Sequence, residues 1–295
     1  MYVGKREIKI TGRMLRIARL DAEMYQFLSE PEPVIEALHD CRQRVDLFTF
    51  LQELPRVEPK FDYPMEWDNL AVLPLSTFEE WWKSVGCKTR NKARLAEKKG
   101  VSVREVPFDE ALAHGIWEIY GEVPVRQGRP FPHFGKSVET IYTEEATYLQ
   151  SSVFIGAFLN EELIGFIKLV HDDARVQAGV MNIVSKVSHK DKSPTNALLA
   201  QAVRSCVERG VRYMVYGKFA YGNRERDTVS DFKERNGFQR VNVPRYYVPL
   251  TGLGSVGIRL GLQHRFVDRL PQSFTNRLRS LRRRWYQHDA QPERS

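Results

Sequence analysis

The stretch from residue 194 to residue 238 constrains the fold of this chain more than any other. Ser193 and Pro194 form an N-cap and first-turn pair, and Gly210 is a typical helix stop, so residues 194–210 are predicted to be a helix. A strand-like run, VRYMVYGKF, follows this helix. A shorter helix around SDFKERN then ends at Asn236-Gly237, a pair typical of left-handed helix caps. Helix, strand and helix in this order favour an α/β (α+β) fold.

The residues before this stretch supply the neighbouring strands. VFIGAFL and LIGFIKLV flank a turn at residues 160–162 and are predicted to pair as a hairpin, with VQAGVMNIV as the third strand. These runs are apolar on both faces, which is typical of a sheet covered on both sides by helices. A capping-box pattern starting at Ser76 predicts a helix there, and residues 87–99 and 109–123 are predicted to be helices as well. NLAVLPL is expected to be a short buried strand and VPRYYVPL a final strand.

Composition places the chain among globular proteins of a reducing compartment. Its three cysteines are scattered, which argues against a disulfide framework, and Cys206 is expected to pack in the core. The N-terminus has no apolar signal region, and no apolar run reaches the roughly 18 residues of a membrane span. The expected location is therefore cytoplasmic. The net charge of +8 is concentrated in two segments, residues 83–104 and 255–286, each with eight basic residues against one acidic residue. Two basic segments favour anionic partners, although solvated helix faces would give the same pattern.

As an ordered set, these segments resemble the GNAT-like fold of the Fem-type aminoacyltransferases and their relatives. The likeness spans roughly residues 80–250. It is carried by CKTRNKARLAEKKGVSVREV, IWEIYGEVPVRQGRPF, PTNALLAQAVRSCVERGVRYMVYGKF and SDFKERNGF. The resemblance implies a mixed, mostly antiparallel sheet flanked by helices. We expect three parts: an N-terminal α/β extension at 1–75, which could be a degenerate first lobe, a GNAT-like acyltransferase domain at 76–250, and a basic C-terminal arm at 251–295.

The resemblance also implies where the chemistry would occur. In GNAT-like domains, two neighbouring strands diverge, and backbone N–H groups beside the gap polarise the acyl carbonyl. The corresponding stretch here is residues 181–184, opposite residues 213–218. Lys233 is the best candidate to stabilise the oxyanion or the leaving group, and Tyr216 is a candidate acid. A solvent-exposed helix lysine and a core-packed tyrosine are the alternative interpretations.

Further candidates follow from residue type and position. The candidates for binding an anionic acceptor or a phosphate are Arg126, Arg129, Lys218 and Tyr221. The loop SHKDKSPTN lacks the glycines of the ordinary CoA-binding fingerprint, so ordinary acetyl-CoA use is not expected. Its basic side chains and the following helix N-terminus still suit a phosphorylated donor. The candidate donor-binding residues are His189, Lys190, Lys192, Ser193 and Asn196. Acyl-CoA, an acyl carrier and aminoacyl-tRNA all stay open as donors.

The C-terminal arm is predicted to be a basic amphipathic helix. Its apolar stripe ends in a tryptophan, an arrangement that suits an anionic membrane surface at the headgroup level. Packing on the protein body and RNA binding are the alternatives. The residues expected to contact the membrane or a nucleic acid are Arg277, Arg279, Arg282, Arg283, Arg284 and Trp285.

Other chemistries are not supported by the sequence. The histidines and cysteines show no metal-ligand spacing, and no P-loop or nucleophile elbow occurs, so no metal is expected. The pair Glu144-Glu145 is expected to be a solvated helix start. The favoured hypothesis is an N-acyltransferase that acts on an amino-sugar or amino-acid group of an envelope or polysaccharide precursor. It would work at the inner face of a membrane, with a small-molecule or lipid-linked acceptor, a tRNA as an optional partner and no DNA. The alternative is a non-catalytic membrane- or RNA-binding protein on an inactive GNAT-like scaffold.

Overall fold

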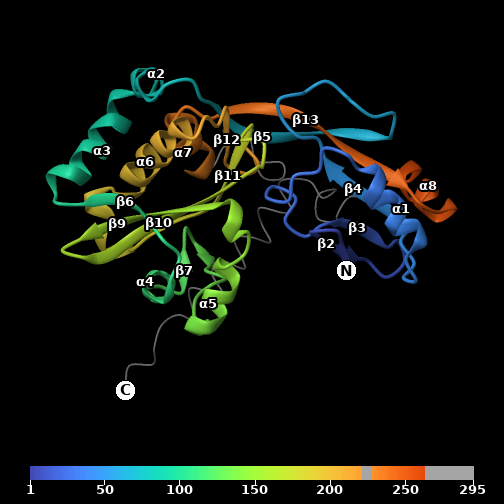
Figure 1. Cartoon of the computed structure of the whole chain (residues 1–295), viewed down its shortest axis with the longest axis horizontal. Helices are drawn as coiled ribbons and strands as arrows, with labels where there is room; N and C mark the ends of the chain where they lie inside the picture. Colours follow the sequence, from blue (N-terminus) through green and yellow to red (C-terminus); the bar gives the residue numbers. More distant parts are fainter. Residues whose placement is uncertain (221–227, 263–295) are drawn as a thin grey trace.

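One twisted sheet runs through the whole molecule and joins its two halves (Figure 1). The structure is a computed structural model that describes residues 1–220 and 228–262. In this part of the chain the sheet has 11 strands in the order β1-β2-β3-β4-β13-β5-β12-β11-β10-β9-β6. The strands are β1 (Tyr2–Val3), β2 (Arg6–Thr11), β3 (Ile17–Leu20), β4 (Leu47–Leu51), β5 (Met65–Pro74), β6 (Ser102–Val106), β9 (Ser152–Leu159), β10 (Glu162–His171), β11 (Gln177–Ser185), β12 (Tyr213–Val215) and β13 (Gln239–Pro249). Among these described strands, only β3–β4 and β11–β12 pair in parallel, so the sheet is mostly antiparallel, as expected.

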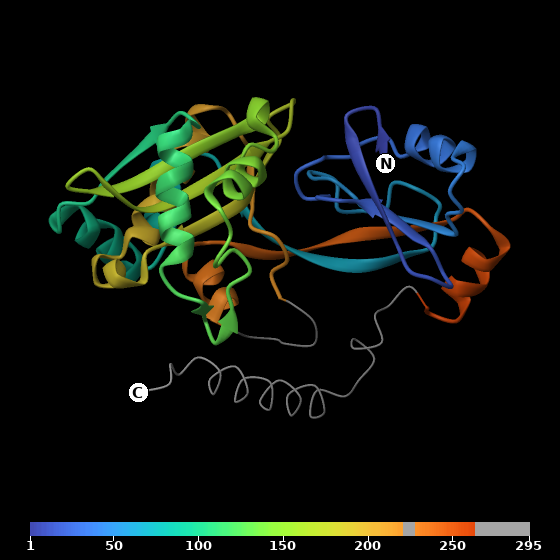
Figure 2. The same ribbon diagram turned by 90° about the horizontal axis from the view of Figure 1, so that it is seen from below.

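Two long strands connect the N-terminal half, which contains β1–β4, with the larger half, which contains β6 and β9–β12. β13 pairs with β5 from Gln239↔Val72 to Tyr246↔Met65, and its end also pairs with β4. Figure 2 shows β5 and β13 crossing together from one half to the other. The sequence prediction of a short strand at residues 69–75 is therefore wrong at its start. The strand begins at Met65, because residues 65–68 continue the pairing with β13 although they carry no apolar run.

Helices cover both faces of the larger half of the sheet, as its doubly apolar strands predicted. The helices are α1 (Glu32–Asp40), α2 (Phe78–Ser84), α3 (Cys87–Lys98), α4 (Glu110–Gly121), α5 (Val138–Glu145), α6 (Pro194–Glu208), α7 (Thr228–Arg235) and α8 (Gly252–Arg259). α2, α3 and α6 share one hydrophobic cluster with the sheet, whereas α4 and α5 share another. A short ribbon of β7 (Val125–Arg126) and β8 (Arg129–Pro130) follows α4.

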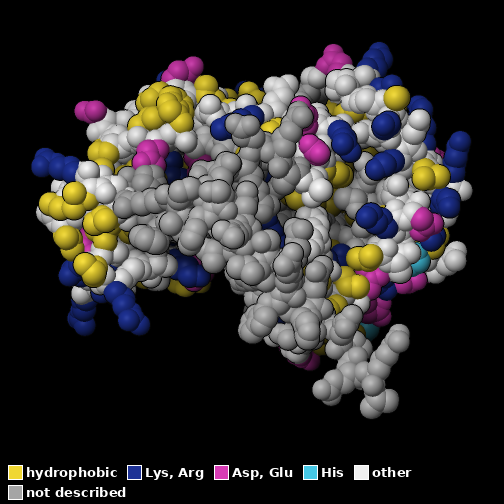
Figure 3. Space-filling view, turned by 180° about the vertical axis from the view of Figure 1, so that it is seen from behind, with side chains coloured by type: hydrophobic (Ala, Val, Ile, Leu, Met, Phe, Trp, Pro, Cys, Tyr) yellow, Lys and Arg dark blue, Asp and Glu magenta, His cyan; other side chains and the backbone are white. Residues whose placement is uncertain are grey.

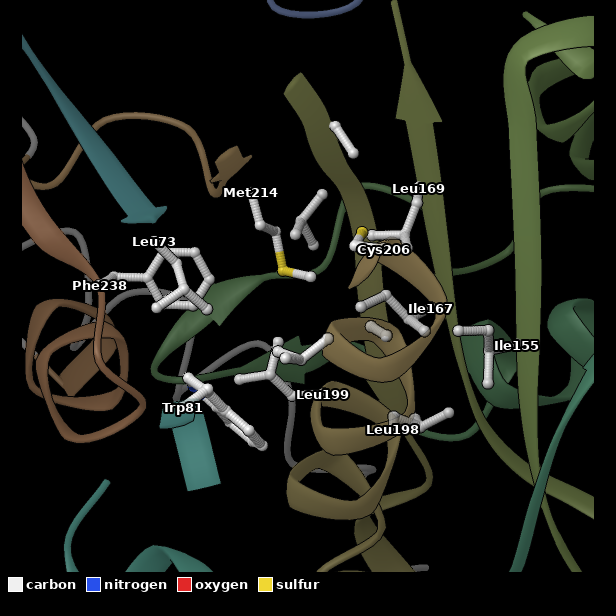
Figure 4. Close-up of a cluster of buried hydrophobic side chains, with 14 of the residues drawn as sticks. Leu73, Trp81, Ile155, Ile167, Leu169, Leu198, Leu199, Cys206, Met214 and Phe238 are labelled. Atoms are coloured by element: carbon white, nitrogen blue, oxygen red, sulfur yellow. The ribbon is translucent and has the colours of Figure 1, made fainter. Parts of the chain in front are cut away.

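The largest core cluster lies between α6 and the sheet (Figure 4). Leu199, Val203 and Cys206, which recur at helical spacing, are buried in it. Burial raises the pKa of the Cys206 thiol to about 12, so this cysteine is an unreactive packing residue. Its expected role in the core is confirmed.

The start of α2 differs by one residue from the sequence prediction. Thr77, not Ser76, is the N-cap, and its side chain accepts a hydrogen bond from the backbone N–H of Glu80. The hydroxyl of Ser76 instead bonds the carboxylate of Glu80. Adjacent Ser and Thr offer the same capping chemistry, so the pattern fixes the helix start only to within a residue.

The described surface mixes side chains of different types. Figure 3 shows Lys and Arg on both halves of the face seen from behind, with hydrophobic and acidic side chains among them. Among residues 1–220 and 228–262, no helix combines the length and apolar character needed to cross a bilayer.

Candidate functional site

The strands β11 and β12 separate after three paired positions. Gln177, Ala178 and Gly179 pair with Tyr213, Met214 and Val215. The chain then follows β5 instead, because Tyr216 donates its N–H to Ala71 O and Ala71 donates its N–H to Gly217 O. Beyond Gly179, β11 continues to Ser185, and among the described strands this stretch pairs with β10 alone. The divergence expected between these strands is therefore present.

A β-bulge lies at the start of the gap. Along the β10–β11 pairing, Leu169 lies opposite Val180 and Lys168 opposite Asn182, so Met181 is the extra residue. A bulge leaves one residue outside the regular ladder and re-aims its neighbours. This bulge falls in residues 181–184, the stretch expected to present backbone N–H groups to an acyl carbonyl.

Lys233 lies next to the segment that leaves β11. Its side chain is fully buried, its ammonium donates to Lys218 O at 2.6 Å, and it lies 4.5 Å from the centroid of the Tyr216 ring. The alternative interpretation of Lys233 as an exposed helix lysine is therefore wrong. On α7 this side chain points into the protein, and a buried ammonium needs such oxygen and π partners.

Tyr216 and Lys218, also singled out from the sequence, flank this lysine. The Tyr216 ring packs against Phe238, with ring centroids 5.9 Å apart. Lys218 forms an ion pair of 2.7 Å with Asp68. Asp68 also accepts from Arg245 at 2.9 Å. Burial alone would raise the pKa of Asp68, but Arg245 and Lys218 hold it below its ordinary value.

A tyrosine from the N-terminal half reaches the mouth of the gap. The Tyr25 hydroxyl donates to Val180 O at 3.2 Å, one residue beyond the last paired position of β11. Gly179 makes this approach possible, because a Cβ there would lie 2.8 Å from the Tyr25 ring. Sequence reasoning missed Tyr25, which lies in the loop between β3 and α1, about 155 residues from its partner.

The structure places Arg126 at the far end of β11, away from Lys233. Its guanidinium donates to Ser185 O at 2.7 Å and to Ile119 O at 2.6 Å, so it ties the end of α4 to the sheet. Arg129 is exposed on β8. Both arginines stay candidates for binding an anionic group.

The candidate donor-binding loop precedes α6. Residues 187–192 form a 3-10 turn, and Ser193 adopts a left-handed conformation with φ 55° before the helix begins. Lys190 is exposed, Lys192 pairs with Asp191 at 3.3 Å, and the ring of His189 lies 3.8 Å from Glu162. Asn196, in the first turn of α6, donates its backbone N–H to Ser193 O. The loop thus gathers the predicted residues at one helix N-terminus.

Other predicted residues lie outside the described part of the chain. Tyr221 is one of them. The others are the arm residues Arg277, Arg279, Arg282, Arg283, Arg284 and Trp285. Their proposed roles stay predictions.

The prediction that Glu144-Glu145 is a solvated helix start is wrong. The pair ends α5, and the Glu145 side chain is 2 % exposed. Its carboxylate accepts from the Tyr120 hydroxyl at 2.9 Å and from the Asn182 amide at 2.9 Å. The buried ammonium of Lys168 donates to Glu145 O and Thr147 O, the carbonyls at the end of this helix. Burial lowers the pKa of Lys168 to about 8, although the nearby Glu145 opposes that shift.

Within residues 1–220 and 228–262, the histidine, cysteine, aspartate and glutamate side chains form no group of three that could hold a metal ion. The site that the described residues define is a gap in a sheet, bordered by a buried cation and a tyrosine hydroxyl. Both features are ones that proton and acyl transfer can use.

The divergent parallel pair, the bulge and the flanking helices define the class of fold: it is GNAT-like, in the arrangement of the Fem-type branch. This confirms the resemblance stated from the sequence. No family model matches the chain, and no curated protein matches it by sequence.

Individual solved structures agree with this class. FemX is similar over 86% of this chain and 86% of its own, with 11% identity and a TM-score of 0.57. The C-terminal domain of a protein described as a lysylphosphatidylglycerol synthetase from Agrobacterium fabrum gives a TM-score of 0.55, with 14% identity, over 85% of this chain and 83% of its own. L-PGS from Bacillus licheniformis gives 0.55 and 14% identity, over 86% and 84%. At such identities the similarity establishes the fold.

Proposed function

We propose that this protein is an acyltransferase that joins an acyl or aminoacyl group to an amine in the gap between β11 and β12. The observation that carries the proposal is the separation of these strands after Gly179 and Val215, beside the fully buried Lys233. A gap in a sheet exposes backbone N–H groups in a fixed orientation, which is what stabilises a developing oxyanion.

The chemical class of the donor follows from what surrounds the gap. A buried ammonium stabilises a leaving oxygen or sulfur anion as a point charge. The loop before α6 offers basic side chains and a helix N-terminus for phosphates of the donor. An aminoacyl-tRNA or an acyl thioester fits both features, and the name lysylphosphatidylglycerol synthetase denotes aminoacyl chemistry on a similar fold.

For the acceptor, we favour an amine on an amino-sugar or amino-acid group of an envelope precursor, small or lipid-linked. The support is the similarity to FemX together with the basic arm, which would hold the protein at an anionic membrane surface at the cytoplasmic side. At the described start of this arm, Leu253 and Val256 of α8 and Leu260 just after it are exposed, a set that could lie against lipid.

The test is an acyl-transfer assay on the full chain. Purified protein is incubated with radiolabelled aminoacyl-tRNA or with an acyl-CoA, and with amine acceptors, and products are identified by mass spectrometry. Co-purifying thioesters or nucleotides are screened in the same way. Transfer that requires the protein supports the proposal. Binding of vesicles or RNA, with no transfer from any donor, would favour the alternative of a non-catalytic binding protein.

A further inference from the structure

A pocket opens at the root of the strand gap, on the side of Tyr25. Gly179 and Val215, the last paired residues of β11 and β12, line it together with Gln177. Its other walls come from the N-terminal half, from Glu23, Met24 and Phe27 and from the end of β4. Its free volume is about 20 Å³, room for one group the size of water or of a primary amine.

Glu53 lines this pocket, and the surrounding residues do not satisfy all of its hydrogen-bonding capacity. Its Oε1 atom is buried and has no hydrogen-bond partner among the described residues. The other acidic residue of the pocket, Glu23, is satisfied by Arg245, with contacts of 2.5 and 3.0 Å. The neighbouring Gln52 is also satisfied, because its amide donates to Arg56 O and Glu58 O. Buried carboxylate oxygens usually have partners, so one that lacks a partner beside a pocket needs an explanation.

We infer that Glu53 is the general base that removes a proton from the acceptor amine at the root of the strand gap. This inference rests on the proposed function. The acceptor enters as an ammonium, and Glu53 takes one proton from it. The neutral nitrogen then attacks the carbonyl carbon of the acyl ester or thioester donor and forms the C–N bond. The bond to the leaving oxygen or sulfur breaks, and that atom keeps the electron pair and takes the second proton of the amine.

The charges around Glu53 suit this role. Burial and the nearby Asp172 together raise the pKa of Glu53 to about 7, although Arg6 and Lys60 oppose the rise. A base whose pKa lies near the working pH is populated in its charged form and still holds a proton strongly. Asp172, at the turn between β10 and β11, also accepts the N–H of Gln177, so it is fixed beside the pocket.

The test compares Glu53→Gln with a matched control, Glu58→Gln. Glu58 is an exposed carboxylate in the same loop. The transfer rate is measured from pH 5.5 to 9 at limiting and at saturating acceptor. For wild type we expect the rate to rise through an apparent pKa of about 7. Glu53→Gln should lose this rise of the rate with pH, and its transfer rate should be lower by roughly 10²- to 10⁴-fold. Glu58→Gln should match wild type.

A second readout does not depend on activity. The folded-state pKa of Glu53 lies above its ordinary value of 4.5, so its stabilising contribution is present below pH 4.5 and is lost as the pH rises through about 7. Glu53→Gln should therefore gain thermal stability relative to wild type between pH 5 and 8. No relative gain would show that the carboxylate is not held in this environment.

The outcomes separate the inference from the function on which it rests. Wild-type protein that transfers no acyl group from any donor overturns the proposed function, and the assignment of Glu53 with it. Wild-type transfer with an unchanged rate and pH profile in Glu53→Gln overturns the base alone. Loss of the rise in transfer rate with pH in Glu53→Gln, with folding intact, supports the inference.

Discussion

Two lysines of the larger half are completely buried, and each is bound by backbone carbonyls. Lys168 holds the end of α5, and Lys233 holds the segment after β12. Removing the Lys168 ammonium takes a donor from the carbonyls of Glu145 and Thr147, and removing the Lys233 ammonium takes one from the carbonyl of Lys218. Such a loss costs about 1–3 kcal/mol. The two lysines differ in position, since only Lys233 borders the diverging segment.

For Lys233→Met we expect the transfer rate to fall by at least about 10²-fold, because the cation is lost beside the site of charge development. An exposed helix lysine could be replaced with little effect on stability, whereas the burial of Lys233 predicts a loss of about 1–3 kcal/mol. The measurement is single-turnover transfer at a temperature where circular dichroism shows the variant folded. A rate that falls only in proportion to the folded fraction would mark Lys233 as purely structural.

For Lys168→Met we expect a loss of about 2 kcal/mol at pH 7, measured by chemical denaturation. The pKa of Lys168 is about 8 in the folded protein against 10.5 ordinarily, so the unfolded state binds more protons between these values. Wild type should therefore gain stability relative to the variant as the pH rises from 8 to 10. A constant difference across that range would contradict the assigned environment of Lys168.

The residues that the sequence did not reveal share one property. Tyr25, Glu53 and Glu145 carry no local pattern, and each gains its surroundings from segments far away in the chain. Lys233 could be named because it lies in a recognisable stretch, SDFKERNGF, yet its burial could not. The core position of Cys206 on α6 could be predicted, because which face of a helix is buried depends on periodicity alone.

At the scale of elements, β12 is shorter than the strand that the sequence predicts. The apolar run from Val211 to Phe219 reads as one strand, but only Tyr213–Val215 is one. The residues after Val215 stay hydrogen-bonded to β5 and separate from β11. Which of the two strands they follow depends on competition between partners that are far apart in the sequence. The sequence therefore predicted the strand and, through the family resemblance, the gap, but not the position at which the gap opens.

The buried hydroxyl of Tyr246 links β13 to the segment between β4 and β5. The Tyr246 side chain is fully buried, and its hydroxyl donates to Gln52 Oε1 at 2.7 Å and accepts the N–H of Lys60 at 2.7 Å. Gln52 Oε1 also accepts the N–H of Lys60 at 3.0 Å, so Tyr246→Phe leaves these two groups bonded to each other. The mutation removes one hydrogen bond from each of them and the oxygen that accepts the N–H of Phe61. We expect a loss of about 0.5–1.5 kcal/mol in urea denaturation, with an unchanged m-value. A neutral result would mean that water replaces the hydroxyl.

At the scale of the whole molecule, the two halves share β5 and β13. Breaking either half takes away hydrogen-bond partners from strands that the other half needs. We expect the halves to unfold in one cooperative transition. Hydrogen exchange at increasing denaturant should show β4 and β10 losing protection together. Loss of protection in β4 at a clearly lower concentration would instead identify an independent N-terminal unit.

The contact between Tyr25 and Gly179 has a practical consequence for anyone who shortens this protein. Expressing the larger half by itself would remove one wall of the pocket in which the reaction is proposed to occur, even if the fragment stayed soluble. An inactive truncation would then say nothing about the chemistry of the remaining piece. Enzymology on this chain should begin with both halves present.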